Sequence, residues 1–223
     1  MARRGKMMKL AVAAGLLWAW QAGAARADHT ETRDYSIFVG GKEAGQSRFV
    51  ITQKDDGTAT LAASASVKVQ FIITYTYQVD STEVWKDGKL VNLNLSCNEN
   101  GKRTSVQANA QGSQLRVVVN GSERLIRPDV WTTSYWKLAD ARFHNKTVPI
   151  LDADSGKEST AQLQYVGTEQ INIGSQPENC YHFRVVGSGN PIDLWYDRYH
   201  RLVRQDFVEQ GHRTIIQLVN VKR

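Results

Sequence analysis

Hydrophobic and polar residues alternate along most of the chain. From residue 72 to residue 82 the hydrophobic side chains share one face and the polar ones the other, namely Ile73, Tyr75, Tyr77 and Val79 against Thr74, Thr76, Gln78 and Asp80. The same period of two returns at residues 102–110, 115–119, 161–165 and 181–185. Successive side chains of a strand point to opposite faces, so this pattern predicts strands that are buried on one side only.

Turn-forming residues separate these stretches. Between them stand Gly40-Gly41, Asp87-Gly88, Asn100-Gly101, Asn120-Gly121 and Gln210-Gly211. Glycine, asparagine and aspartate tolerate the positive φ of tight hairpin turns, which indicates direct reversals between neighbouring strands. Parallel strands would instead show continuous apolar runs separated by helices. The pattern therefore predicts an antiparallel meander.

One break interrupts the alternation. Residues 132–142 are the best candidate for a helix, because capping residues are followed by apolar residues near helical spacing. The break divides about eight predicted strands in residues 34–126 from about six in residues 147–221. We predict an all-β fold: one strongly curved antiparallel sheet, as a half-barrel or open barrel, with a short helical or irregular crossing segment at residues 127–150.

The first 27 residues have the features of a signal peptide. A basic start precedes an apolar run from Leu10 to Trp20, and Ala25-Arg26-Ala27 has the small-x-small pattern that signal peptidase cuts. The run is shorter than the about 20 residues that a membrane-spanning helix needs, although an uncleaved anchor is the alternative. We predict cleavage before Asp28, export to the bacterial periplasm or beyond, and a single β domain over residues 28–223.

Charge argues against nucleic-acid binding. Five of the 28 lysines and arginines lie in the leader, which leaves 23 basic against 22 acidic residues and a net charge of +1. A protein that binds nucleic acid needs a dense basic face to displace counterions from phosphates. Here the basic residues are scattered among acidic ones, so we expect no nucleic-acid partner, and no membrane span after cleavage.

Several segments, taken in order, resemble one family. The first runs from Tyr35 to Gly45 and contains the hairpin Gly40-Gly41-Lys42. Others follow across nearly the whole mature chain: Ser81-Thr82-Glu83-Val84-Trp85, Asn98-Glu99-Asn100-Gly101, Thr133-Ser134-Tyr135-Trp136 and Leu194-Trp195-Tyr196-Asp197. This order resembles the DUF6134 family of exported bacterial proteins of unknown function. More distantly the layout is similar to the DUF3108 family and to half-barrel envelope proteins such as periplasmic lipoprotein carriers.

The resemblance has two departures. The chain lacks the clear lid helices of the lipoprotein carriers, and Cys97 stands where the DUF6134 pattern has threonine. Similarity of fold does not carry function, so the wider resemblance implies architecture only.

Two cysteines in an exported chain suggest a disulfide. Cys97 ends one predicted strand and Cys180 begins another, and an oxidising compartment would let them pair. The alternative is two separate buried thiols, because pairing depends on geometry. A cysteine nucleophile is disfavoured, since His182 lies near Cys180 but no orienting partner is indicated.

Other catalytic and metal patterns are weak. The five histidines show no metal-ligand spacing, so we interpret them as solvated loop or strand-face residues and expect no metal or cofactor. Asp152 to Gly156 lacks the ligand positions of a calcium loop and reads as a turn. Asp80 and Glu83 could form an acid pair, but they lie on opposite faces of one strand and read as solvated charges.

Aromatic residues gather in the crossing segment. Trp131, Tyr135 and Trp136 could cover the open side of a half-barrel and gate an apolar cavity, which makes them candidate ligand-binding residues. The alternative is that they only fill the core.

Three functions remain compatible with the sequence. We expect a non-enzymatic protein that binds a hydrophobic or envelope-derived ligand. One alternative is a hydrolase with an active site that the spacing of residues in the sequence does not reveal. The other is a protein-interaction module without a small ligand. The sequence leaves the oligomeric state open.

Overall fold

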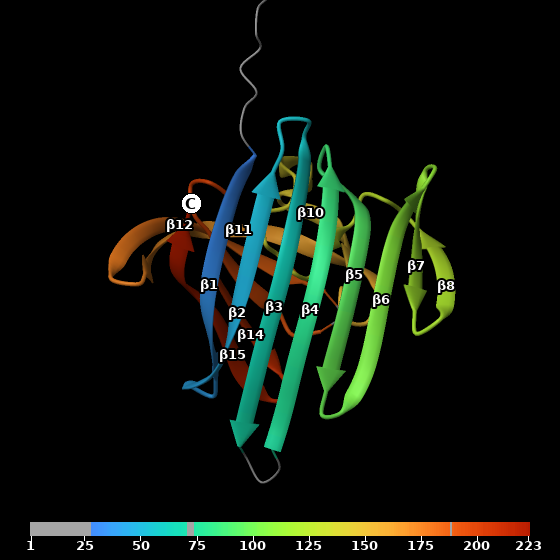
Figure 1. Ribbon diagram of the computed structural model, residues 1–223. Helices are drawn as coiled ribbons and strands as arrows, with labels where there is room; N and C mark the ends of the chain where they lie inside the picture. The colour runs from blue at the N-terminus through green and yellow to red at the C-terminus, as the bar shows by residue number, and fades with distance from the viewer. Residues whose placement is uncertain (1–27, 71–73, 188) are drawn as a thin grey trace, which may run out of the picture.

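A single sheet contains all fifteen strands of the described residues (Figure 1). The computed structural model describes residues 28–70, 74–187 and 189–223. In space the strands follow the order β8-β7-β6-β5-β4-β3-β2-β1-β15-β14-β13-β12-β11-β10-β9. Neighbours pair antiparallel, except that β9 and β10 run parallel. The predicted all-β, largely antiparallel fold is confirmed.

Two meanders build this sheet. The first contains β1 (His29–Val39), β2 (Lys42–Gln53), β3 (Thr58–Gln70), β4 (Thr74–Lys86), β5 (Lys89–Glu99), β6 (Lys102–Gln111), β7 (Gln114–Val119) and β8 (Ser122–Ile126). The second contains β10 (Lys146–Leu151), β11 (Glu158–Ile173), β12 (Gln176–Val186), β13 (Ile192–Tyr196), β14 (Leu202–Glu209) and β15 (His212–Lys222), with the short β9 (Trp131–Thr132) beside β10. The predicted groups of eight and six strands are confirmed. The strand predicted at 72–82 corresponds to β4, and residues 71–73 lie outside the described residues.

The two meanders meet at the middle of the sheet. Strand β1 pairs with β15, so that Ile37 lies opposite Ile216 and Thr32 opposite Lys222. From this central pair the first meander runs out to β8 at one edge, and the second runs back from β9 at the other edge. The crossing segment therefore connects the two edges of an open sheet.

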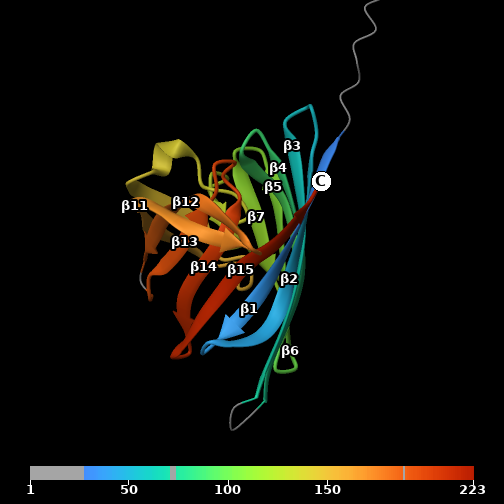
Figure 2. The ribbon, with the colours of Figure 1, turned by 90° about the vertical axis from the view of Figure 1, so that its left-hand side faces the viewer.

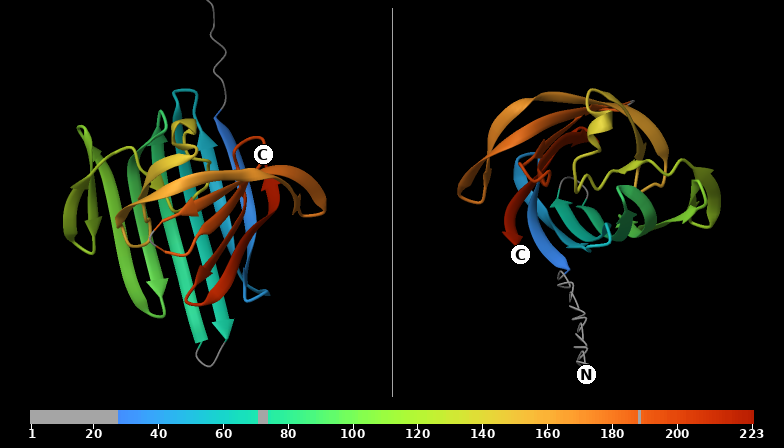
Figure 3. Two further views of the ribbon diagram at one scale, coloured as in Figure 1. Left: turned by 180° about the vertical axis from the view of Figure 1, so that it is seen from behind. Right: turned by 90° about the horizontal axis from the view of Figure 1, so that it is seen from above.

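The sheet is strongly curved, as predicted. Seen from the side, the long strands β1 to β6 form one wall and β11 to β15 curl round to face it (Figure 2). Seen from above, the sheet bends around a hollow side and the crossing segment runs within the bend (Figure 3). Bulges interrupt the ladders at Ile37/Phe38, Val84/Trp85 and Trp195/Tyr196. Bulges increase local twist, which helps to curve a sheet.

The hairpin turns have the backbone that their sequences predict. In Asn100-Gly101 the two φ angles are 50° and 86°, and in Asn120-Gly121 they are 47° and 89°. Two positive φ angles define the hairpin turn whose twist matches that of the flanking strands. These dipeptides therefore reverse the chain directly from β5 to β6 and from β7 to β8.

The helix predicted at residues 132–142 is wrong. This stretch contains the end of β9, an isolated bridge between Lys137 and Arg201, and the start of a short 3₁₀ helix, η1 (Ala141–Phe143). Two of its backbone carbonyls accept hydrogen bonds from distant side chains instead of from amides of a helix. Arg33 Nη1 donates to the carbonyl oxygen of Trp136 at 2.6 Å, and Tyr196 Oη donates to the carbonyl oxygen of Tyr135 at 3.1 Å. Tertiary contacts override the weak helical preference.

The predicted signal peptide, residues 1–27, lies outside the described residues. Within the described part of the chain, no helix has the length and hydropathy to cross a membrane.

Candidate functional site: a concave cavity

The hollow side of the sheet contains a cavity of about 840 Å³. One wall comes from the first meander and the facing wall from β14 and β15. Hydrophobic side chains dominate both walls: Ile37, Phe49, Val67, Val69, Val79 and Leu95 on the first, and Leu202, Phe207, Val208 and Ile216 on the second.

Strand alternation explains why these side chains point inward. In the β3–β4 ladder Ala65 pairs with Val79, Val67 with Tyr77 and Val69 with Tyr75, and all of them line the cavity. Directly paired residues of antiparallel strands share a face. The period of two that predicted this hairpin therefore also builds the cavity wall.

The crossing segment fills the rest of the hollow side, and its aromatic residues are buried. Tyr135 lines the cavity, whereas Trp131 and Trp136 lie in the hydrophobic core and outside the cavity lining. Trp131 meets the Tyr135 ring edge-on with centroids 4.7 Å apart, and Trp136 meets Trp85 at 6.4 Å. Of the three predicted ligand-binding residues, the structure thus places one in the cavity wall and two behind it.

A buried ion network holds the crossing segment against β1. Arg33, which donates to the carbonyl of Trp136, also donates from Nε to Glu31 Oε1 at 2.7 Å. Arg201 and Arg223 each donate to Glu31 Oε2 at 3.0 Å. Burial opposes ionisation of Glu31, but its three arginine partners outweigh burial and lower its pKa to about 2. The network fixes one end of the cavity rather than leaving a free lid.

Glu83 is buried beneath the same segment, contrary to the expectation of a solvated charge. Its side chain has no exposed surface, and Oε2 accepts from Trp85 Nε1 at 2.8 Å and from Thr132 Oγ1 at 3.1 Å. Oε1 is buried without a hydrogen-bond partner among the described residues. Burial raises the pKa of Glu83 despite these hydrogen bonds, which favours the neutral acid. Glu83 lies an even number of residues after the inward-facing Tyr77 and Val79, so strand alternation places it on the same face. The sequence therefore does contain a signal for its inward position.

Two tyrosines connect the cavity wall to acidic side chains. Tyr77 Oη donates to Asp154 Oδ2 at 2.7 Å, and Tyr75 Oη donates to Glu99 Oε1 at 3.2 Å. Asp154 belongs to the β10–β11 turn, where Gly156 has a φ of +66° and a Cβ would lie 2.5 Å from Val119 Cγ2. Only glycine lets this turn approach β7 so closely. The stretch predicted as a turn therefore projects an acid into the cavity.

A second polar cluster lies on the other face of the second meander. His182 is buried rather than solvated as expected, and its Nδ1 and Nε2 each lie 2.7 Å from a carboxylate, of Glu169 and Asp193 respectively. Its ring stacks on Trp195 with centroids 4.3 Å apart. Arg184 and His182 outweigh burial and lower the pKa of Asp193. Strand register brings these residues together, so their spacing in the sequence gave no signal for the cluster.

The cysteine pair predicted from the sequence is wrong, because both thiols are free and buried. Cys97 lines the cavity, whereas the Cys180 thiol donates to the carbonyl oxygen of Glu178 at 3.6 Å and lies outside the cavity lining. Burial, with the charges of Asp154 and Glu99, raises the pKa of Cys97 to about 11. Such a thiol is protonated near neutral pH and is a poor nucleophile.

The described residues contain no group of three or more His, Cys, Asp or Glu side chains that could hold a metal ion. The cavity offers mainly apolar walls, tyrosine hydroxyls and separate carboxyl groups. This arrangement suits the reversible binding of a molecule with a large apolar part.

A known structure shares the architecture. The beta-barrel-like protein of domain of unknown function DUF1849 from Brucella abortus superposes with a TM-score of 0.65 at 10% identity, covering 89% of this chain and 99% of that one. A LolA superfamily protein from Nitrosomonas europaea gives a TM-score of 0.26 at 12% identity, covering 86% of this chain and 85% of that one, which is too weak to support an argument. The first similarity supports the fold alone.

No curated protein matches the chain. The family model described as domain of unknown function DUF6134 matches residues 35–219, across both meanders and the crossing segment. The resemblance seen in the ordered segments of the sequence is therefore confirmed, and the chain belongs to the DUF6134 family.

Proposed function

We propose that the chain is exported, loses residues 1–27, and binds an apolar small molecule or envelope component in its concave cavity without chemical conversion. The observation that carries the proposal is the cavity itself, about 840 Å³ between two hydrophobic walls. Ligand pockets commonly measure about 300–1,000 Å³ and are lined mainly by apolar side chains. Transfer of apolar surface from water into such walls supplies about 25 cal/mol per Å² of buried area.

Because the crossing segment is held in place, we expect the ligand to enter the cavity from the opposite end. There the lining includes Tyr75 at the start of β4, Glu99 at the end of β5 and Glu209 at the end of β14. Arg33 and Tyr196 donate hydrogen bonds to carbonyl oxygens of the crossing segment. Ligand entry on that side would therefore break buried hydrogen bonds. We infer entry between the paired residues Val69 and Tyr75 on one side and the end of the β14–β15 hairpin on the other.

A pair of neighbouring substitutions on β3 tests the proposal. Ala65 lines the cavity, whereas the exposed Ala62 is outside its lining and points to the other face of the strand. The probe is N-phenyl-1-naphthylamine, an uncharged dye whose fluorescence rises in apolar surroundings. We expect the mature protein to bind it, Ala65→Phe to fill the cavity and weaken binding about tenfold or more, and Ala62→Phe to bind as the unmodified protein does.

Two results would contradict binding in the cavity: no uptake of the dye by the mature protein, or equal affinity in both variants. Export is tested separately by intact-mass analysis of periplasmic material, which should give a chain that starts at Asp28. An uncleaved cytosolic product would contradict that part of the proposal.

A further inference from the structure

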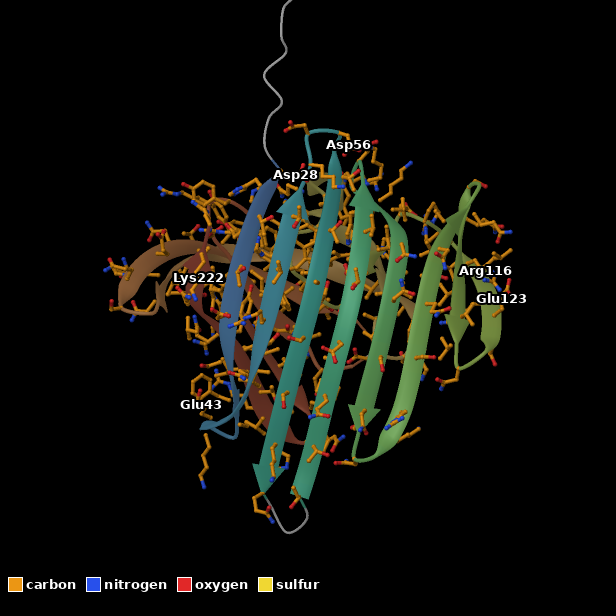
Figure 4. The ribbon with its side chains drawn as sticks, in the orientation of Figure 1. Asp28, Glu43, Asp56, Arg116, Glu123 and Lys222 are labelled. Atoms are coloured by element: carbon orange, nitrogen blue, oxygen red, sulfur yellow. The ribbon has the colours of Figure 1, made fainter. Side chains whose placement is uncertain are left out.

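Most acidic side chains in ion pairs of this protein have an arginine partner. Asp206, for example, pairs with Arg213 at 2.6 Å and Arg204 at 3.1 Å, and Asp34 pairs with Arg48 at 2.7 Å. The pair Arg116–Glu123 joins β7 to β8 at the edge of the sheet (Figure 4). Among the described residues, nine of the 22 acidic side chains form ion pairs.

Four of the acids without an ion pair lie together in the cavity lining. We call Glu99, Asp152, Asp154 and Glu209 the cavity carboxylates; they come from the end of β5, the β10–β11 turn and the end of β14. In the described part of the chain, none of them has an ion pair with lysine, arginine or histidine within 4.0 Å. Tyrosine hydroxyls bond Glu99 and Asp154, and backbone amides of the turn bond Asp152.

The cavity carboxylates are close enough to influence one another. Asp154 is accessible from the cavity, yet its surroundings desolvate it and, with Asp152 and Glu99, raise its pKa. Desolvation, followed by the charges of Glu99, Asp154 and Asp152, also raises the pKa of Glu209. Like charges gathered in this way repel one another, and a cation placed among them would relieve the repulsion. Lys102 and His212 are the basic side chains in the same lining.

The spread of these acids also restricts which cation would fit. They do not form a compact group that could coordinate a metal ion. An organic ammonium group needs no close coordination shell and can interact with several separated carboxylates. The apolar walls next to them would accept a hydrocarbon chain.

We propose that the ligand is a cationic amphiphile, with its hydrocarbon chain between the apolar walls and its ammonium group among Glu99, Asp154 and Glu209. This inference rests on the proposed binding function and adds the charge of the ligand. Fatty acids of the same length are disfavoured, because their carboxylate would meet the cavity carboxylates.

Three ligands that share one chain length test the charge. Dodecylammonium, dodecanol and dodecanoate compete with N-phenyl-1-naphthylamine near neutral pH, the two ionic ligands below their critical micelle concentrations and dodecanol below its solubility limit. We expect dodecylammonium to bind about tenfold more tightly than dodecanol, because several weak, partly screened ion pairs together contribute roughly one factor of ten in affinity. Dodecanoate should bind most weakly. High salt should reduce the difference between the three, since it screens exposed charges.

A double variant locates the effect. Asp154→Asn combined with Glu209→Gln should weaken dodecylammonium binding about tenfold more than dodecanol binding, and so abolish most of the preference for the cation. The matched control combines Glu43→Gln with Glu158→Gln, two exposed acids outside the cavity lining, of which Glu43 lies next to the β1–β2 turn (Figure 4). Melting temperatures of both double variants show whether each has folded.

The outcomes separate the two proposals. If dodecanol and dodecylammonium bind equally, or dodecanoate binds most tightly, the inference about charge is wrong and apolar binding stands. If no ligand displaces the dye and the dye itself does not bind, the proposed function is wrong and the inference falls with it. An unchanged preference in the Asp154/Glu209 double variant would also overturn the inference.

Discussion

The hydroxyl of Tyr77 donates a 2.7 Å hydrogen bond to Oδ2 of Asp154 and thereby joins β4 to the β10–β11 turn. The bond links the two meanders at the cavity wall, and it lowers the pKa of Asp154 against the larger effect of desolvation. One hydroxyl thus holds the turn in place and keeps its acid more easily ionised.

Removal of this hydroxyl should affect both properties. In Tyr77→Phe we expect the pKa of Asp154 to rise and the free energy of unfolding to fall by about 1 kcal/mol, the usual net value of one hydrogen bond. Carboxyl titration by NMR and urea denaturation measure the two changes. In the control, Tyr165→Phe, an exposed hydroxyl is lost and the pKa of Asp154 should not move. An unchanged pKa in Tyr77→Phe would contradict the assignment.

Glu31 should contribute stability that depends on pH. Its pKa is about 2 in the fold against 4.5 for the free side chain, so its contribution is complete above the free value and disappears as the pH falls through about 2. The shift corresponds to about 3 kcal/mol near neutral pH. Urea denaturation of Glu31→Gln should show a loss of this order at pH 7 that shrinks toward pH 2. A loss that is independent of pH would rule out the ionic origin.

Glu83 should have the opposite dependence. Its pKa is raised in the fold, so its contribution is complete below the free value of 4.5 and is lost as the pH rises through the folded pKa. Glu83→Gln keeps the shape and an acceptor for Trp85 and Thr132 but cannot ionise. The unmodified protein should therefore lose stability relative to this variant with rising pH, by up to about 1.4 kcal/mol per pH unit. Parallel pH profiles of the two proteins would show that Glu83 does not titrate in this way.

Trp136 should matter for stability rather than for direct ligand contact. Its ring is buried against Trp85 and lies outside the cavity lining. Trp136→Ala should cost about 3–5 kcal/mol of unfolding free energy, as truncation of large buried aromatics does. The folded fraction should still bind N-phenyl-1-naphthylamine, and Tyr181→Ala, at an exposed position, serves as the control. Lost binding with unchanged stability would place Trp136 at the ligand instead.

The two cysteines should be recovered as free thiols. Both should resist alkylation in the native protein, because they are buried and their pKa values are raised to about 11 for Cys97 and about 12 for Cys180. Denaturation without reductant should make both react. Peptide mapping of periplasmic material under non-reducing conditions provides the measurement, and a peptide containing Cys97 linked to Cys180 would contradict the structure.

The sequence predicts local features of this fold far better than long-range ones. Alternation through Tyr77 and Val79 and turns such as Asn100-Gly101 specify hairpins, because strand period and turn backbone depend on neighbouring residues. The path of the crossing segment depends on Arg33 and Tyr196, which are distant in sequence and bond its carbonyls. No local pattern contains that information.

The candidate site was predictable in kind but not in detail. A curved sheet with aromatic residues over its hollow side indicated an apolar cavity, and Tyr135 does line it. The acids Asp154 and Glu209 meet there only because the β10–β11 turn and the end of β14 come together in space. Their spacing in the chain gave no reason to group them, just as it gave none for Glu169 beside His182.

The pairing of β1 with β15 makes folding of this sheet a whole-chain event. Each meander can form hairpin by hairpin from contacts between neighbouring residues. The ladder between β1 and β15, in which Thr32 lies opposite Lys222, can form only when both meanders are available. Contacts between such distant residues slow folding, and until they form, the edge of β1 is an unpaired template for other chains. Under the proposed export, this delay would keep the chain open while it crosses the membrane, because the sheet cannot close before β15 has emerged.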